Sequence, residues 1–355
     1  MEPWFSDEEK KALADYFDRG GWATEFEKTK ELEKSIAEFT GSKHCVFTTS
    51  GTAALFLILK ALGIGAGHEV IVPDFTMIGT ANAVHWAGAE PVFVDIHPSN
   101  WCLDLDGVEK AITPKTKALI LVSFNGRSPK MNRAKEIADR HKIFLIEDAA
   151  QSLGSRSKGQ HLGTFGIAGM FSFSAPKVIT TGQGGAIVTS SDELDQKIRQ
   201  LKDFGRKQSG VDEHPVMGYN FKVTDIQSVI GIEQMKKLPW RLERKKEMYA
   251  LYRKELEGVD EIEWVETNLE EASPWFIDVL VSEREELREF LKSEGVGTRP
   301  VYPPIHSQGA YGKKGSFPVT EKIAKHGLWL PSSSFLKDED IIQICRKIKK
   351  FYLEV

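Results

Sequence analysis

The sequence predicts an α/β fold in which a parallel type of sheet is covered by helices on both faces, followed by a smaller α+β domain. Three observations support this. The chain has 355 residues, which exceeds the size at which a single core keeps growing, so we expect one large and one smaller domain. Short apolar, β-branched runs recur along the first half of the chain. Segments with helical periodicity lie between many of these runs.

Seven such runs are expected to be strands, and helices are expected at residues 53–62 and 134–141, where apolar residues recur three and four apart. The first five runs predict βα units of a doubly wound domain. The last two are too close together for a helical crossover, and a loop containing Lys177 joins them. The runs are CVFTTS (45–50), EVIVP (69–73), EPVFVDI (90–96), ALILVS (118–123), IFLIEDA (143–149), MFSFS (170–174) and GAIVTS (185–190).

After about residue 190 the composition shifts toward charged helix, as in QMKKLPWRLERKKEMYALYRKELEG (234–258). Residues 274–299 then alternate strand and helix, and the chain closes with IIQICRKIKKFYLEV. We therefore expect a large domain over residues 1–235, with a helical segment at its start, and a small α+β domain over residues 236–355.

The composition excludes several classes of protein. Forty-seven basic and 51 acidic residues give a net charge of -4, without a basic block, which argues against a nucleic-acid partner. Three widely spaced cysteines fit neither a disulfide framework nor a zinc site, so no metal is expected. No apolar run approaches the roughly 20 residues that span a membrane. The first residues lack the features of a signal peptide, so a cytoplasmic protein is expected.

The first candidate site is the turn in TTSGTAALFLILKAL (48–62). A strand ends there, Ser50, Gly51 and Thr52 form the turn, and a helix begins. Free N–H groups and the positive end of the helix dipole make such a turn suitable for a phosphate. An ordinary N-cap by Ser50 or Thr52 is the alternative. The turn is not a nucleotide-binding P-loop, because no GK[ST] follows.

The second candidate is Asp148 in IEDAAQ (146–151), at the carboxyl end of an apolar strand. Ligands of open α/β sheets bind at that edge. A buried carboxylate needs a cationic partner, which is a metal, an arginine or a protonated ring nitrogen. An Asp that caps the next turn is the alternative, although Gln151 adds more polar capacity than a cap requires.

The third candidate is Lys177 in MFSFSAPKVITTGQGGAIVTS (170–190). A lysine whose pKa is lowered by burial is a strong nucleophile toward carbonyls. Ser172 offers a hydroxyl nearby, and the glycines that follow let the backbone approach a ligand. By itself, Lys177 is more simply explained as a solvated turn residue.

Taken together, SGTAAL, EDAAQ, FSFSAPKxITTGxGG, GYNFKVTDIQ (218–227), GVGTRPVYPPIH (295–306) and LWLPSSS (328–334) resemble the pyridoxal-phosphate sugar aminotransferases of the DegT/DnrJ/EryC1/StrS family. The resemblance runs from about Gly21 to the C-terminus. It implies the aspartate aminotransferase-like fold (fold type I), whose large domain has a mainly parallel seven-stranded sheet. It also implies pyridoxal 5'-phosphate as the cofactor.

The resemblance also implies roles for individual residues. Lys177 occupies the place of the lysine that forms the internal aldimine, and Asp148 that of the carboxylate that pairs with the pyridine nitrogen. Phosphate-binding positions match Gly51, Thr52 and Ser172, and a position near the cofactor ring matches Gln151. Asn220 matches an asparagine that reaches the phosphate of a neighbouring subunit, which implies a homodimer. Arg299 and His306 lie where the family's small domain approaches the sugar.

The activity implied is a ping-pong transfer of an amino group from L-glutamate to a keto-sugar. The segment DEHPVMGYNFKVTDIQ is most similar to enzymes that aminate C4 of a 4-keto-6-deoxy nucleotide sugar, perosamine synthases among them. The alternatives are a 3-dehydratase, against which Lys177 argues because such relatives carry histidine there, and a cofactor-binding regulatory protein. An NTPase that uses Asp148 for magnesium is a further alternative, which the missing P-loop lysine opposes.

The sequence departs from the family at several positions. Met77 stands where an aromatic residue usually stacks on the cofactor ring, and Phe75 is an alternative for that role. Gln183 replaces a usual glutamate, and Phe204-Gly205 replaces a usual histidine and glycine. Arg127, in FNGRSPKM, suggests either a contact to an anionic group of the acceptor or a surface salt bridge.

Overall fold

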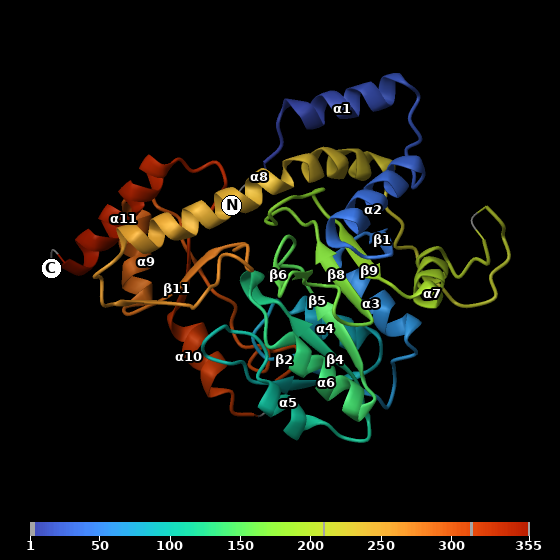
Figure 1. Ribbon diagram of the computed structural model, residues 1–355, viewed down its shortest axis with the longest axis horizontal. Coiled ribbons are helices and arrows are strands. Elements are labelled where there is room, and N and C mark those ends of the chain that lie inside the picture. The colour runs from blue at the N-terminus through green and yellow to red at the C-terminus, as the bar shows by residue number, and fades with distance from the viewer. Residues whose placement is uncertain (1–3, 209, 313–314, 354–355) are drawn as a thin grey trace.

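A computed structural model describes residues 4–208, 210–312 and 315–353, and its centre is a seven-stranded sheet (Figure 1). The strand order is β1-β9-β8-β5-β4-β2-β3, in which β9 alone runs against the other six. All seven predicted runs form strands, and the predicted mainly parallel sheet is confirmed. The strands are β1 (His44–Thr48), β2 (Glu69–Pro73), β3 (Glu90–Val94), β4 (Thr116–Val122), β5 (Phe144–Asp148), β8 (Ala168–Ser172) and β9 (Gly185–Thr189).

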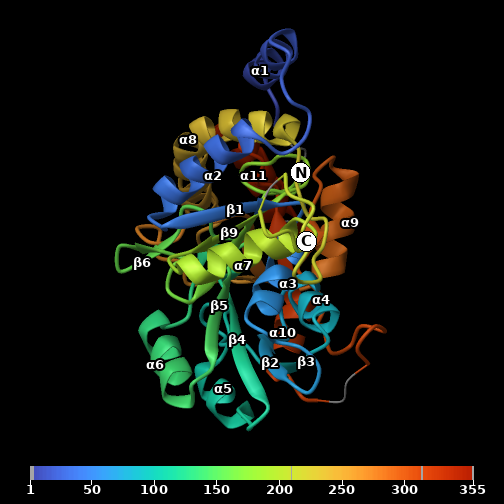
Figure 2. The same ribbon diagram turned by 90° about the vertical axis from the view of Figure 1, so that its right-hand side faces the viewer.

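Helices cover both faces of this sheet because side chains alternate along its buried strands. Val70 and Val72 of β2 pack in one apolar cluster with α3, α4 and α7, whereas Ile71 packs in another with α5 and α6. Figure 2 shows α6 on one side of β4 and β5, and α3 and α4 on the other. The helices are α3 (Gly51–Ala61), α4 (Gly79–Trp86), α5 (Leu105–Ala111), α6 (Met131–His141) and α7 (Asp192–Lys202).

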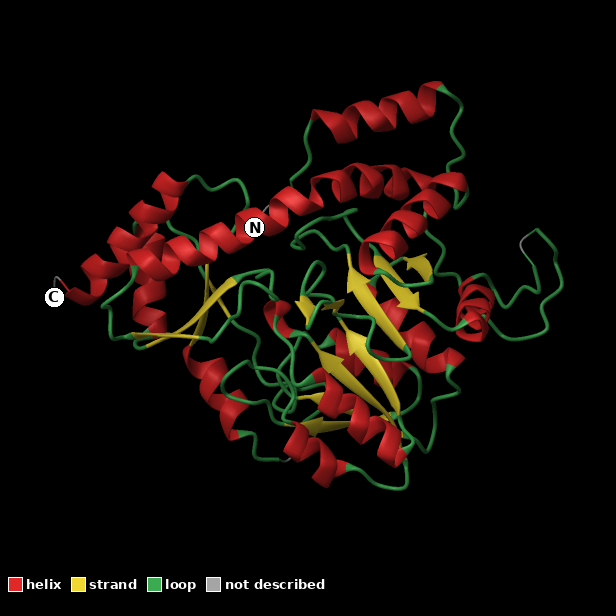
Figure 3. Cartoon of the chain, viewed as in Figure 1, coloured by secondary structure: helices red, strands yellow, loops and turns green. Residues whose placement is uncertain are grey.

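A smaller antiparallel sheet of order β10-β11-β13-β12 has a separate apolar core with α8, α9 and α11. The element bounds are β10 (Ile262–Trp264), β11 (Ile277–Val281), β12 (Arg299–Pro300), β13 (Gly327–Leu330), α9 (Arg284–Ser293), α10 (Pro318–His326) and α11 (Asp338–Leu353). The long helix α8 (Asp225–Glu255) runs from the large sheet to the small one (Figures 1 and 3). The predicted boundary after residue 235 therefore falls inside a continuous helix.

The N-terminal helices α1 (Asp7–Asp18) and α2 (Glu27–Thr40) pack against α8. Asp225, the first residue of α8, accepts hydrogen bonds from the N–H groups of Phe26, Lys28 and Thr29. This carboxylate supplies the cap that α2 lacks from its own N-cap residue, because Phe26 has no side-chain acceptor.

Three short elements complete the fold, namely β6 (Arg156–Ser157), β7 (Gln160–His161) and the 3-10 turn η1 (Phe124–Gly126). None of the described helices combines the length and apolar character needed to cross a membrane.

Candidate active site

Asp148 is the last residue of β5 and lies buried at the carboxyl edge of the large sheet. Its Oδ2 accepts a hydrogen bond of 2.6 Å from the Thr80 hydroxyl, and its Oδ1 accepts one of 3.2 Å from the Ala150 N–H. Burial raises the pKa of this carboxyl, while the two hydrogen bonds and the charge of Lys177 lower it in part. No described residue forms an ion pair with Asp148, although Lys177 lies close enough for its charge to act on the carboxyl.

The predicted phosphate turn lies beside Ser172 because of the strand order. Gly185 of β9 pairs with Thr48 on one side and with Ser172 on the other. A Cβ at Gly185 would lie 2.4 Å from the Ser50 carbonyl carbon, and one at Gly51 would lie 3.4 Å from the Ser172 Cβ. Only glycine at position 185 allows strands and turn to approach this closely.

The N-cap alternative and the phosphate interpretation both find support in this turn. The Ser50 hydroxyl accepts from the Ala53 N–H at 3.1 Å and is therefore the cap of α3. The N–H groups of Gly51 and Thr52, at the first two positions of the helix, have no acceptor within it. Together with the Ser172 hydroxyl, they form a set of donors suited to a phosphate.

Lys177 lies in the loop between β8 and β9, where its N–H donates to the Ser174 carbonyl at 3.0 Å. Burial lowers the pKa of its amine to about 7, although the charge of Asp148 raises it. The Lys177 Nζ lies 3.6 Å from the ring centroid of Trp275. A substantial fraction of an amine with this pKa is the free base at neutral pH and can act as a nucleophile or accept a proton.

Met77, rather than Phe75, is placed to face a ligand. Phe75 is fully buried and packs against Trp101 and Phe124. Met77 is 46% exposed, and a Cβ at Gly79 would lie 2.7 Å from the Thr52 Oγ1 and 2.9 Å from the Met77 Cε. The thioether thus lies beside the phosphate turn, where it can pack on a ring face.

Gln151 is buried, and its Oε1 accepts from the Asn125 N–H at 3.0 Å. The side chain of Asn125 in turn donates to the Phe276 carbonyl at 2.7 Å and accepts from the Phe276 N–H at 2.6 Å. Asn125 has a φ of 51°, which asparagine tolerates better than most residues. Gln151 therefore supports the junction between the two sheets through Asn125.

The segment from Arg299 to His306 is held against the large sheet by Asp74, which directly follows β2. The Asp74 carboxylate accepts from the His306 N–H at 2.7 Å and contacts the His306 Nδ1 at 2.6 Å. Burial raises the pKa of Tyr302, and the charges of Arg299 and Asp148 act on it in opposite directions. These contacts bring Arg299, Tyr302 and His306 to the same side of the molecule as Asp148.

Arg127 requires a correction. It is 5% exposed, and its guanidinium donates to the two carboxylate oxygens of Asp278 in β11 at 3.0 and 2.5 Å. Further hydrogen bonds go to the Asn100 carbonyl and the Thr267 hydroxyl. The ion pair is buried rather than at the surface, and because the guanidinium is occupied by these partners, the geometry does not support a contact to the acceptor.

The predicted site residue Asn220 and the unusual residue Gln183 are both exposed. Asn220 forms an isolated bridge with Asp203 and is exposed in the single chain. The side chain of Gln183 is also exposed, while its main-chain oxygen accepts from Thr181 and Gln227. Nothing in the structure explains the replacement of the family's glutamate by Gln183.

Several residues near the site were not singled out from the sequence, namely Thr80, Asp74, Asn125, Trp275 and Tyr302. Thr80 stands in a helix and Trp275 in a loop before a strand, and neither belongs to a short motif with a known role. Tyr302 lies inside the GVGTRPVYPPIH segment. The predictions for its neighbours Arg299 and His306 were therefore the signal that could have pointed to it. The others come to the site through tertiary contacts between segments far apart in the sequence.

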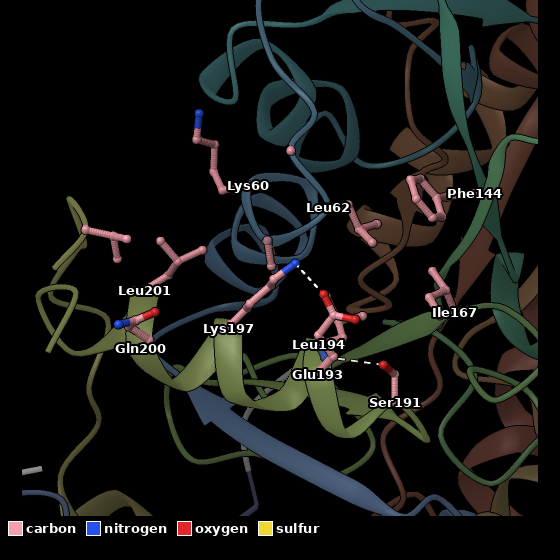
Figure 4. Close-up of a pocket in the computed structure, with 13 residues that line it drawn as sticks. Lys60, Leu62, Phe144, Ile167, Ser191, Glu193, Leu194, Lys197, Gln200 and Leu201 are labelled. Carbon is pink, nitrogen blue, oxygen red and sulfur yellow. Dashed lines mark hydrogen bonds and ion pairs between the residues drawn. The ribbon is translucent and has the colours of Figure 1, made fainter. Parts of the chain in front are cut away.

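A separate hollow lies at the opposite edge of the large sheet (Figure 4). It is lined by Phe144, the first residue of β5, and by Ile167, which directly precedes β8, together with residues of α3 and α7. The Lys197–Glu193 pair of α7 borders it. Since Asp148 and Ser172 end these same two strands, this hollow is distinct from the candidate site.

The candidate site has the features that pyridoxal 5'-phosphate requires. The turn at Gly51 and Thr52, with Ser172, supplies donors for the phosphate. Asp148 is a buried carboxylate that forms no ion pair with the described residues, so its charge could pair with the protonated nitrogen of a pyridine ring. Lys177 is an amine of low pKa in the same region. These residues fit the cofactor, and no metal is needed to balance Asp148.

Comparison with known proteins gives the same result. Residues 5–349 match the DegT/DnrJ/EryC1/StrS aminotransferase family. The chain is 34% identical to a GDP-perosamine synthase of Escherichia coli O157:H7, with 99% of this chain and 97% of that protein covered. It is 36% identical to a UDP-N-acetyl-3-dehydro-alpha-D-glucosamine 3-aminotransferase of Acidithiobacillus ferrooxidans, with 90% and 88% covered.

Among solved structures, the crystal structure of S. venezuelae DesV in complex with a ketimine intermediate superposes with a TM-score of 0.93 at 33% identity, covering 98% of this chain and 95% of that one. The chain thus has the predicted fold and the predicted cofactor, and it is a pyridoxal-phosphate-dependent enzyme of the DegT/DnrJ/EryC1/StrS aminotransferase family.

Proposed function

We propose that this aminotransferase moves an amino group from L-glutamate to C4 of a 4-keto-6-deoxy nucleotide sugar. The observation that carries this proposal is the full-length similarity to GDP-perosamine synthase, together with the placement of an amine of low pKa near a buried carboxylate. The segment DEHPVMGYNFKVTDIQ also resembles enzymes that aminate this position.

Each residue has a defined task in the proposed reaction. When bound, the cofactor supplies an electron sink that stabilises negative charge at the carbon from which a proton is removed. Gly51, Thr52 and Ser172 would hold its phosphate, and Met77 would pack against its ring. Asp148 would keep the ring nitrogen protonated, and Thr80 orients that carboxylate through its hydrogen bond.

The Lys177 amine would accept the proton from the α-carbon of L-glutamate and would deliver it to the cofactor carbon that carries the transferred nitrogen. Its low pKa suits both steps, because a group with a pKa near 7 accepts and releases protons readily at neutral pH. The small-domain segment carrying Arg299 and His306 closes the sugar side of the site, where their cationic and polar groups suit a phosphorylated substrate.

A second relative aminates C3 of a different sugar, so the test must distinguish the position of amination. Purified enzyme is incubated with L-glutamate and each of a set of 3-keto and 4-keto nucleotide sugars, while 2-oxoglutarate is measured and the product's amine is located by NMR. We expect turnover with a 4-keto-6-deoxy sugar. Turnover confined to 3-keto sugars would overturn the assignment of C4 and leave the aminotransferase activity intact.

The same incubation distinguishes the other candidate functions. A 3-dehydratase would remove a hydroxyl from the sugar without forming amino sugar. A cofactor-binding regulatory protein would show neither reaction. Lys177 favours the aminotransferase, because dehydration by the related enzymes proceeds with histidine at that position.

A further inference from the structure

Trp275, two residues before β11, is held from several directions beside the lysine loop. Its indole N–H donates to the Pro176 carbonyl at 2.6 Å, next to Lys177 in the chain. Its own carbonyl accepts from the Lys245 Nζ at 3.0 Å. The N–H of the next residue, Phe276, donates to the Asn125 Oδ1. Trp275 is 3% exposed, and these contacts hold it between the lysine loop, α8 and the turn at Asn125.

The face of this fixed ring is occupied by the Lys177 amine, with the Nζ 3.6 Å from the ring centroid. An ammonium ion close to an indole face is attracted by the negative potential of the ring, and the attraction is stronger where water is excluded. The contact therefore opposes the effect of burial, which disfavours the charged amine.

The charged groups that face this region are known from the described residues. Asp148 approaches from the end of β5 and raises the pKa of Lys177. Arg241 and Lys245 of α8 line the same small cavity as Lys177 and Trp4. Lys245 donates to the carbonyls of Trp275 and Ser332, and burial together with Arg241 lowers its pKa to about 7. Apart from the ring, Asp148 is thus the group that stabilises a proton on Lys177.

We propose that the indole face of Trp275 is the resting site of the Lys177 amine whenever that amine has no covalent partner, which makes Trp275 a positioning residue for Lys177. Because Trp275 belongs to the small-sheet side of the molecule, the position of the lysine depends on the contact between the two sheets. The effect on transamination rests on the proposed function, whereas the resting site itself does not.

The test measures the proton affinity of the amine without an amino donor or a sugar. Cofactor is removed from the full-length protein, pyridoxal phosphate is added back, and the rate at which the visible band returns is followed as a function of pH. Only the unprotonated amine reacts, and the ionisations of the added cofactor are common to all variants. We expect Trp275→Leu to lower the midpoint of this profile by about one pH unit.

Two comparisons separate the ring face from its hydrogen bond and from packing. Trp275→Phe keeps an aromatic face and loses the bond to Pro176, so its midpoint should stay within a few tenths of a pH unit of the wild type. Phe276→Leu disturbs the same aromatic cluster, because the ring centroids of Phe276 and Trp275 are 4.0 Å apart. This substitution leaves the contact between Lys177 and the Trp275 ring in place. It should lower the melting temperature and leave the midpoint in place.

A fluorinated tryptophan series tests the same contact if Trp275→Leu does not fold. Replacing all eight tryptophans with fluorinated analogues weakens the potential of each ring face with little change in shape. The midpoint should fall progressively in the wild type and not in Trp275→Phe. An equal fall in both backgrounds, or a wild-type midpoint in Trp275→Leu, would overturn the proposal.

The consequence for catalysis is measured separately on the holoenzyme. In single turnovers with L-glutamate, Trp275→Leu should slow proton transfer about tenfold and change the KM for glutamate less than twofold, because the residue positions the base rather than the substrate. A rise in KM at unchanged rate would show that Trp275 binds substrate and would contradict the positioning role.

Discussion

Burial and an aromatic face replace solvent around the amine of Lys177. In Lys177→Ala, the covalent link to the cofactor cannot form. We expect this variant to fold normally, to lack the borohydride-reducible visible band of the wild type, and to show no measurable turnover. Absorption spectra before and after reduction check this. A reducible band that persists in Lys177→Ala would identify a different lysine as the nucleophile.

Asp148 has a hydroxyl and an amide as its partners, and a single negative charge distinguishes it from asparagine at this position. In Asp148→Asn the shape and both partners are kept while the counter-charge of the ring nitrogen is lost. Turnover should fall about 100-fold, which corresponds to about 2.7 kcal/mol of transition-state stabilisation. Steady-state kinetics measure this, and turnover near that of the wild type would refute the role.

At the scale of elements, the pair formed by Arg127 and Asp278 joins the turn η1 to β11 and hence the large sheet to the small one. Arg127→Met leaves Asp278 buried without a partner, which should lower the free energy of unfolding by about 3–5 kcal/mol. The double variant Arg127→Met/Asp278→Leu should recover much of this loss. Urea denaturation measures both. A normal stability combined with a raised KM for the sugar would instead restore the substrate role first expected for Arg127.

The elements themselves could be predicted to different degrees, for physical reasons. The strands of the large sheet were found because β-branched runs buried on both faces leave a strong local signal. The pairing of β1 with β9 depends on contacts across about 140 residues, and no local pattern encodes it. The helix α8 continues through Pro239, a residue that would end most helices. Asp148 was singled out as a carboxylate at the end of an apolar strand, and the role of Lys177 was expected from the resemblance of its segment to the family. Trp275 and Thr80 matter only through their neighbours.

At the scale of the whole molecule, the exposed position of Asn220 bears on oligomeric state. Asn220 follows a loop whose apolar side chains are exposed in the single chain, among them Val211, Val216 and Met217. Exposed apolar groups of this kind are covered in many proteins by a second subunit. We therefore expect a homodimer in which Asn220 of one subunit completes the phosphate site of the other.

Subunit mixing tests this arrangement. Lys177→Ala and Asn220→Ala each inactivate a site, but if the site is shared, a hybrid dimer contains one site with both defects and one with neither. The mixture of two inactive variants, unfolded and refolded together, should therefore regain about a quarter of wild-type activity, since random pairing makes half of the dimers hybrids and each hybrid has one intact site. Refolding each variant alone is the control. If the hybrids form, as native mass spectrometry would show, and activity does not return, then Lys177 and Asn220 do not act at the same site from different subunits.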